Sequence, residues 1–105
     1  MFVSKVRIQF DWDPPKARSN LAKHGVAFRG AAVVFDDAFA TTVRDDDHSN
    51  GDERWVTIGM DSATRLVVVV HTWEEDARGR IYVRIVSARR PTKREAHDYE
   101  GGRWR

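Results

Sequence analysis

The unbroken apolar run from Leu66 to Val70 restricts the fold of this chain more than any other feature. No polar residue interrupts it, so it predicts a central strand of a sheet that is covered on both faces. A chain of 105 residues with 41% hydrophobic residues supports one such core. We therefore expect a single domain over residues 1–105, with a loose lead-in at 1–5 and a loose tail at 101–105.

Other strands are expected before and after this run, which itself is read as extending to Trp73. Apolar and polar residues alternate from Val6 to Trp12, with Val6, Ile8, Phe10 and Trp12 on the buried face, and again from Ile81 to Ile85. Residues 39–43 and 55–59 also read as strands. Polar turns are expected at 45–52, 61–64 and 74–79.

Three helices complete the expected order of elements. Asp13-Pro14-Pro15 predicts a helix start, and Gly25 predicts its end at His24, with Ala17, Leu21 and His24 on one face. Phe28, Ala31, Ala32 and Phe35 have the spacing of a short second helix. The last helix is expected from Pro91 or Lys93 to about Glu100. The order β-α-α-β-β-β-β-α predicts an α+β domain with a mainly antiparallel sheet.

Composition excludes several classes of function. Without cysteine the chain has no disulfide, thiolate nucleophile or cysteine-based zinc site. The histidines lack the HExxH spacing, and the aspartate-rich loop at 45–52 lacks the ligand order of an EF-hand, so no metal site is expected. No apolar stretch is long enough to span a membrane, and no signal peptide is evident, so a cytoplasmic protein is expected.

Basic residues concentrate in the second half of the chain. Residues 1–53 carry 7 Lys and Arg against 9 Asp and Glu, and residues 54–105 carry 11 against 7. Five cations lie at or near the end of the last strand and the start of the last helix, where free N–H groups and the helix dipole favour anions. They are Arg84, Arg89, Arg90, Lys93 and Arg94. Thr92 and Glu95 form a capping-box pattern at the same helix start.

Seven segments carry a resemblance to a known family. They are Phe10-Asp11-Trp12-Asp13-Pro14, Asn20-Leu21-Ala22-Lys23-His24-Gly25-Val26, Val34-Phe35-Asp36-Asp37, Asp47-His48-Ser49, Glu53-Arg54, Ile58-Gly59 and the run from Ser87 to Glu95. In their order and spacing, from about residue 7 to Glu100, they resemble the BrnT toxins, the ribonuclease half of the BrnT/BrnA type II toxin-antitoxin systems. Ala27 and Pro91 depart from the usual family residues.

The resemblance implies a RelE-like α+β fold and metal-independent cleavage of RNA. It also implies a cognate BrnA-like antitoxin with a ribbon-helix-helix DNA-binding part, which inactivates the toxin and carries the contacts to operator DNA. The chain is thus expected to be an endoribonuclease toxin that inhibits translation. The alternative is a non-catalytic nucleic-acid-binding module.

Metal-free cleavage of RNA needs a base near the ribose 2′-OH, cations at the phosphate and an acid for the leaving oxygen. His24 is the expected base or acid, and Arg84 and Arg89 are the expected catalytic arginines. Expected substrate-binding residues are Lys23, Arg54, Tyr82, Arg90 and Lys93. The competing interpretations stay open: His24 as a core or helix-end residue, the arginines as surface cations, and Glu53-Arg54 as a structural ion pair.

Overall fold

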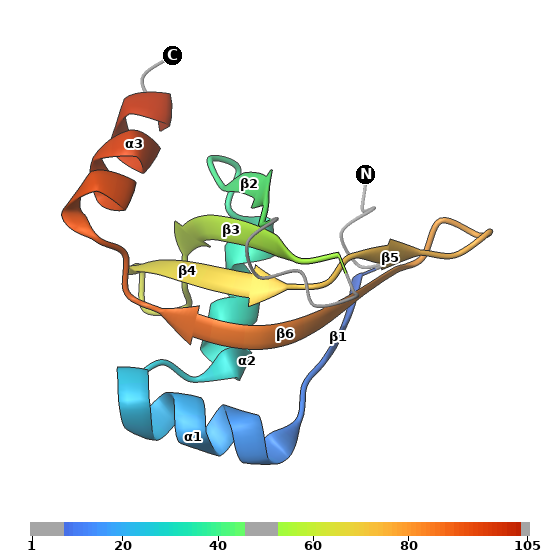
Figure 1. Ribbon diagram of the computed structural model, residues 1–105. Coiled ribbons are helices and arrows are strands. Elements are labelled where there is room, and N and C mark those ends of the chain that lie inside the picture. The colour runs from blue at the N-terminus through green and yellow to red at the C-terminus, as the bar shows by residue number, and fades with distance from the viewer. Residues whose placement is uncertain (1–7, 46–52, 104–105) are drawn as a thin grey trace.

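The computed structural model describes residues 8–45 and 53–103 (Figure 1). The lead-in at 1–5, Val6 and the part of the polar loop at 46–52 lie outside the described residues, as do 104–105 of the tail. In chain order the elements are β1 (Ile8–Asp11), α1 (Pro14–His24), α2 (Phe28–Ala31), the 3-10 helix η2 (Ala32–Asp36), β2 (Thr41–Arg44), β3 (Trp55–Met60), β4 (Leu66–His71), β5 (Glu74–Glu75), β6 (Ile81–Arg89) and α3 (Lys93–Arg103).

One sheet organises the domain, with strand order β1-β6-β4-β3-β2 and the short β5 paired to β6. β1 runs parallel to β6, and the other pairs are antiparallel. The apolar run lies in β4 between β6 and β3, and Val67, Val68 and Val69 are buried. The predicted central strand and the mainly antiparallel α+β fold are therefore confirmed.

The core lies between this sheet and the two N-terminal helices. Val67 and Val69 of β4 and Val83 and Ile85 of β6 pack there with a set of residues from α2, η2 and the adjoining loop: Val26, Phe28, Ala31 and Val34. Ile8, Trp12, Ala17 and Phe35 pack at the edge of this cluster. The alternation in Ile81 to Ile85 thus predicted the buried side of β6 correctly.

Helix α1 ends where the sequence predicted, and Ala17 packs against the core as expected, but Asn20 takes the place of Leu21 on the packed face. Gly25 has φ +69°, and its N–H donates to the Leu21 carbonyl at 2.9 Å, which closes the helix after His24. Leu21, expected to pack on the sheet, is 50% exposed, whereas Asn20 is buried. The Asn20 amide donates to Ala88 O (2.8 Å) and Val26 O (3.0 Å), and it accepts from Ala88 N. Hydrogen bonds from Asn20 to β6 therefore replace the expected apolar contact of Leu21. They are made to the second half of β6, because β1 pairs only with the first half.

Four other boundaries differ from the expectation. The second helix tightens into the 3-10 helix η2 after Ala31. The expected turn at 74–79 contains β5, the strand from Leu66 ends at His71, and α3 continues past Glu100 to Arg103. Phe10, expected on the buried face of β1, is 36% exposed because β1 is an edge strand.

Helix α3 is held from both ends. Its capping box forms as predicted, since Thr92 N donates to Glu95 Oε1 (2.8 Å) and Glu95 N donates to Thr92 Oγ1 (3.1 Å). Near its other end Tyr99 is buried, and its hydroxyl donates to Asp37 Oδ2 at 2.6 Å. The same carboxylate accepts from Met60 N in β3. The helix therefore stands against the β3 side of the sheet, away from the β1-β5 end (Figure 1).

Candidate active site

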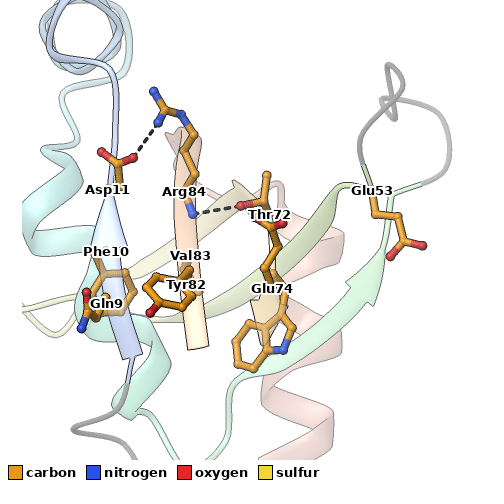
Figure 2. Close-up of a pocket in the computed structure, with 10 residues that line it drawn as sticks. Gln9, Phe10, Asp11, Glu53, Thr72, Glu74, Tyr82, Val83 and Arg84 are labelled. Atoms are coloured by element: carbon orange, nitrogen blue, oxygen red, sulfur yellow. Dashed lines mark hydrogen bonds and ion pairs between the residues drawn. The ribbon is translucent and has the colours of Figure 1, made fainter. Parts of the chain in front are cut away.

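A pocket of about 590 Å³ lies at the end of the sheet where β1, β5 and the first half of β6 meet (Figure 2). It is lined by Gln9, Phe10, Asp11, Glu53, Thr72, Trp73, Glu74, Tyr82, Val83 and Arg84. Two of the predicted site residues, Tyr82 and Arg84, are in this set. The pocket's volume falls in the range of about 300–1,000 Å³ that is typical of small-ligand sites.

Arg84 is placed by both neighbouring strands. Its backbone pairs with Thr72, since Thr72 N donates to Arg84 O (3.0 Å) and Arg84 N donates to Thr72 Oγ1 (3.0 Å). Its guanidinium donates to Asp11 Oδ2 at 2.6 Å, and the two side chains are 51% and 66% exposed. That hydrogen bond uses one N–H of the five in a guanidinium. The remaining N–H groups can donate to phosphate oxygens that approach from the solvent side.

Tyr82 lies one row below Arg84 on the same face of β6. The strand register places Gln9 of β1 and Glu74 of β5 directly opposite it, so the three side chains form a row across the sheet (Figure 2). The Tyr82 hydroxyl donates to Asp76 Oδ2 at 3.3 Å. The Asp76 carboxylate is itself fixed by Arg80 N, the Arg80 side chain and Arg78 N, which lower its pKa to about 2. The ring is thus held at its far end.

Arg89 and Arg90, at the other end of β6, use their guanidinium groups in hydrogen bonds within the protein. Arg89 donates to both oxygens of Glu95, at 2.8 and 3.0 Å. This pair, together with the N–H of Thr92, lowers the pKa of Glu95 to about 2. Arg90 donates to Asp61 Oδ2 (3.2 Å) and to the Leu66 carbonyl (3.1 Å). A phosphate at either guanidinium would have to share it with these partners.

The remaining predicted cations lie elsewhere on the surface. Lys93 is exposed at the start of α3, and Arg54 is partly buried beside the pocket residue Glu53. Lys23 is exposed at the end of α1, beside the partly buried His24. Within the described ranges 8–45 and 53–103, no hydrogen bond or ion pair joins His24 to Arg84 or Arg89.

The sheet itself separates His24 from Arg89. Ala88 packs in the core on the side of the N-terminal helices. Adjacent residues of a strand point to opposite faces, so Arg89 points to the other side, where it meets Glu95 of α3. The structure therefore brings Tyr82 and Arg84 together but places His24 with neither of the arginines predicted to be catalytic. The roles of His24 and Arg89 stay predictions.

His71 and Tyr99 are both buried and have structural roles. His71 is fully buried, with Nδ1 2.8 Å from the Thr72 carbonyl and Nε2 2.7 Å from Thr57 Oγ1. Burial lowers its pKa, and a neutral ring that donates through Nδ1 and accepts through Nε2 satisfies both contacts. Tyr99, the other tyrosine of the chain, is 3% exposed. Of these two tyrosines, only Tyr82 offers a ring face to RNA.

Sequence reasoning did not select Gln9, Asp11, Thr72 and Glu74, which complete the pocket. Alternation in β1 already placed Gln9 and Asp11 on the outward face. What the sequence did not show is that β1 pairs in parallel with β6, which sets Asp11 opposite Arg84. The sequence analysis placed Thr72 near the end of a strand and Glu74 in a turn, so neither was considered as a site residue.

Among residues 8–45 and 53–103, no group of three or more acidic or histidine side chains is placed to hold a metal ion. None of the helices in this part of the chain is long and apolar enough to cross a bilayer.

Comparison with known proteins identifies the family. Residues 12–95 match the family model described as "Ribonuclease toxin, BrnT, of type II toxin-antitoxin system". Among solved structures, the chain resembles the Brucella abortus ribonuclease toxin BrnT, with a TM-score of 0.60 and 20% identity over 82% of this chain and 99% of that one. No curated protein sequence matches. The solved structure confirms the RelE-like α+β fold, and the family match covers most of the chain. This chain therefore belongs to the BrnT family of ribonuclease toxins of type II toxin-antitoxin systems.

Proposed function

We propose that this chain is an endoribonuclease that cleaves RNA without a metal ion, in the pocket that contains Arg84. The main observation behind this proposal is that the Arg84 guanidinium lines this pocket. Its side chain is more than half exposed, and it contacts Asp11 at 2.6 Å. Membership of a ribonuclease toxin family supports RNA as the substrate. The pocket adds a cation for the phosphate, a neighbouring carboxylate and an exposed aromatic ring.

The reaction is attack of a ribose 2′-OH on the adjacent phosphorus. The new O–P bond forms as the P–O5′ bond breaks, and the leaving 5′-oxygen takes a proton from solvent water, which leaves a 2′,3′-cyclic phosphate and a 5′-OH. Arg84 binds the phosphate and stabilises the negative charge of the phosphorane. Asp11 contacts Arg84 directly, so a phosphate held by Arg84 lies beside this carboxylate. We assign Asp11 the role of accepting the proton of the 2′-OH.

Cleavage chemistry is tested with the purified protein and a single-stranded RNA in EDTA. We expect products with 2′,3′-cyclic phosphate ends, and no cleavage of a strand with 2′-deoxyribose at the reactive position. Loss of cleavage in EDTA that magnesium restores would contradict metal independence. Binding of RNA without any cleavage would identify the chain as a non-catalytic nucleic-acid-binding module.

In the cell this activity inhibits translation until a cognate antitoxin binds over the active face. The family pairs such toxins with an antitoxin. We assign the antitoxin a ribbon-helix-helix DNA-binding part, through which the complex contacts operator DNA. Gel-shift titration of operator DNA should show sequence-specific binding by the complex and none by the toxin alone. Specific operator binding by the toxin alone would contradict this assignment.

A further inference from the structure

The polar face beside Arg84 has the parts of a nucleobase subsite, and each part is placed by strand register. Gln9, Tyr82 and Glu74 come from three adjacent strands, β1, β6 and β5, and lie in one row (Figure 2). All three are exposed and line the pocket. Side chains that face each other across neighbouring strands stand on the same side of the sheet. A flat ligand lying on Tyr82 therefore meets Gln9 at one edge and Glu74 at the other.

Tyr82 is suited to stack on a base. It is 36% exposed, and the hydrogen bond from its hydroxyl to Asp76 fixes the far end of the ring. Bases of single-stranded RNA stack on such exposed aromatic rings. Because the hydroxyl is already used, the ring offers its face and not a proton donor.

Glu74 offers a carboxylate to the edge of a stacked base. Among residues 8–45 and 53–103 its carboxylate has no hydrogen-bond or ion-pair partner, unlike Asp11, which holds Arg84. An ionised carboxylate only accepts hydrogen bonds, through two oxygens side by side. Guanine presents two adjacent donors on its Watson–Crick edge, N1–H and N2–H. Adenine and cytosine place one amino donor beside a ring-nitrogen acceptor, and uracil places one N–H between two carbonyl groups.

The rest of the row fits the same base. The Gln9 amide can donate one N–H to O6 or N7 on the opposite edge of guanine. The next row along β6 holds Asp11, Arg84 and Thr72, about 6.6 Å away for a step of two residues. A nucleotide whose base lies on Tyr82 therefore has its phosphate within reach of Arg84.

We propose that Glu74, Tyr82 and Gln9 form a guanine subsite, so that this toxin cleaves RNA next to guanosine. The proposal rests on the proposed function for cleavage at Arg84 and adds the base that is recognised there. Glu74 is the residue that determines specificity, and it takes no part in the bond-making steps.

The test uses four oligonucleotides that differ only in the base on one side of a single ribonucleotide linkage, with single-turnover cleavage measured in EDTA. We expect the guanine substrate to be cleaved at least about 10-fold faster than the others, the discrimination of one bidentate base contact. Glu74→Gln should lower cleavage of the guanine substrate by about 10-fold to 100-fold and raise the relative rate for adenine, since an amide matches the donor and acceptor of adenine.

Glu75→Gln is the matched control. It removes the same charge from the neighbouring position of β5, where Glu75 is opposite Ile81 and so on the other face of the sheet. It should keep the preference for guanine. Thermal melting of both variants checks that the fold is intact.

Equal rates on all four substrates, or an unchanged preference in Glu74→Gln, would overturn the subsite. A separate titration with guanosine, adenosine, cytidine and uridine 3′-monophosphates, followed by NMR, reads base binding without cleavage. Preferential binding of guanosine 3′-monophosphate by a protein that cleaves no RNA would refute the proposed function and retain the subsite. If RNA is cleaved but neither assay shows a preference for guanine, the subsite is refuted and the proposed function is retained.

Discussion

The two ends of strand β6 place the same type of residue in opposite situations. At one end, Arg84 contacts Asp11, and both side chains are more than half exposed at a pocket. At the other end, Arg89 contacts Glu95 through two hydrogen bonds, and these side chains are 38% and 33% exposed. Glu95 also caps α3. An arginine–carboxylate pair is therefore not by itself a sign of a site; the difference lies in what else the carboxylate holds.

A further contrast is the packing around each end. The Arg89 end is tied to α1 by Asn20 and to α3 by the capping box, while Arg90 is tied to the turn after β3 by Asp61. Backbone N–H groups of Ala63 and Arg65 and the Arg90 side chain outweigh the effect of burial and lower the pKa of Asp61. At the Arg84 end, β6 is paired with the short strands β1 and β5, and Arg84 itself with Thr72. We expect changes at the first end to affect stability and changes at the second to affect cleavage.

Arg84→Lys should give the largest effect on activity. Lysine keeps the charge but loses the planar fork that can bind Asp11 and a phosphate together. We expect single-turnover cleavage to fall by about 100-fold or more, with a smaller loss of RNA affinity and a nearly unchanged melting temperature. Arg18→Lys, on the exposed side of α1, is the control and should cleave normally. Equal losses of affinity and cleavage would reduce Arg84 to a binding residue.

Asn20→Ala should give the largest effect on stability. It removes a buried amide and leaves the N–H and carbonyl of Ala88 and the carbonyl of Val26 without this partner. We expect the free energy of unfolding to fall by about 2–3 kcal/mol, measured by urea denaturation. At temperatures where the variant is folded, its cleavage rate should stay near normal. Leu21→Ala, at the exposed neighbouring position, should cost far less.

Glu95→Gln should change how stability depends on pH. The pKa of Glu95 is about 2 in the folded protein against 4.5 ordinarily, so the folded state binds fewer protons between these values. The stabilisation is therefore present above pH 4.5 and is lost as the pH falls toward 2. After allowance for solvent exposure, we expect Glu95→Gln to be less stable by about 1 kcal/mol at pH 7 and the two proteins to converge near pH 2. A constant difference across that range would contradict the pair's role.

His24→Ala distinguishes the sequence-based hypothesis that His24 is a general acid or base from the proposal that cleavage occurs at Arg84. A general acid or base at His24 predicts a loss of cleavage of about 100-fold. If the chemistry occurs at Arg84, we expect a change of less than about 3-fold, because His24 does not line the pocket. Single-turnover cleavage decides between these values. A 100-fold loss with a normal melting temperature would move the catalytic site toward the end of α1.

Most of the fold followed from local patterns in the sequence. The run at Leu66 to Val70, the alternation at Ile81 to Ile85, the stop at Gly25 and the capping box at Thr92 and Glu95 each depend on neighbours within a few residues. The family motifs agreed with these patterns. The expectation was wrong for Leu21, and for Phe10 it was met only in part, since its ring contacts Phe35 but stays 36% exposed. The reasons were long-range: a side-chain amide bonds the second half of β6, and β1 lies at an edge.

The sequence by itself determined that this is one α+β domain of the BrnT family with an arginine-rich strand leading into its last helix. Only the tertiary structure decided which of those arginines is open to a ligand. That decision depends on pairing between residues far apart in the chain: Asp11 with Arg84, Glu74 with Tyr82 and Asn20 with Ala88. Local periodicity reports which face of a strand is buried, but it carries no information about which strand lies alongside. The parallel pairing of β1 with β6 therefore determines where the pocket lies. The alternation in the sequence had given only the face of the strand on which each side chain lies.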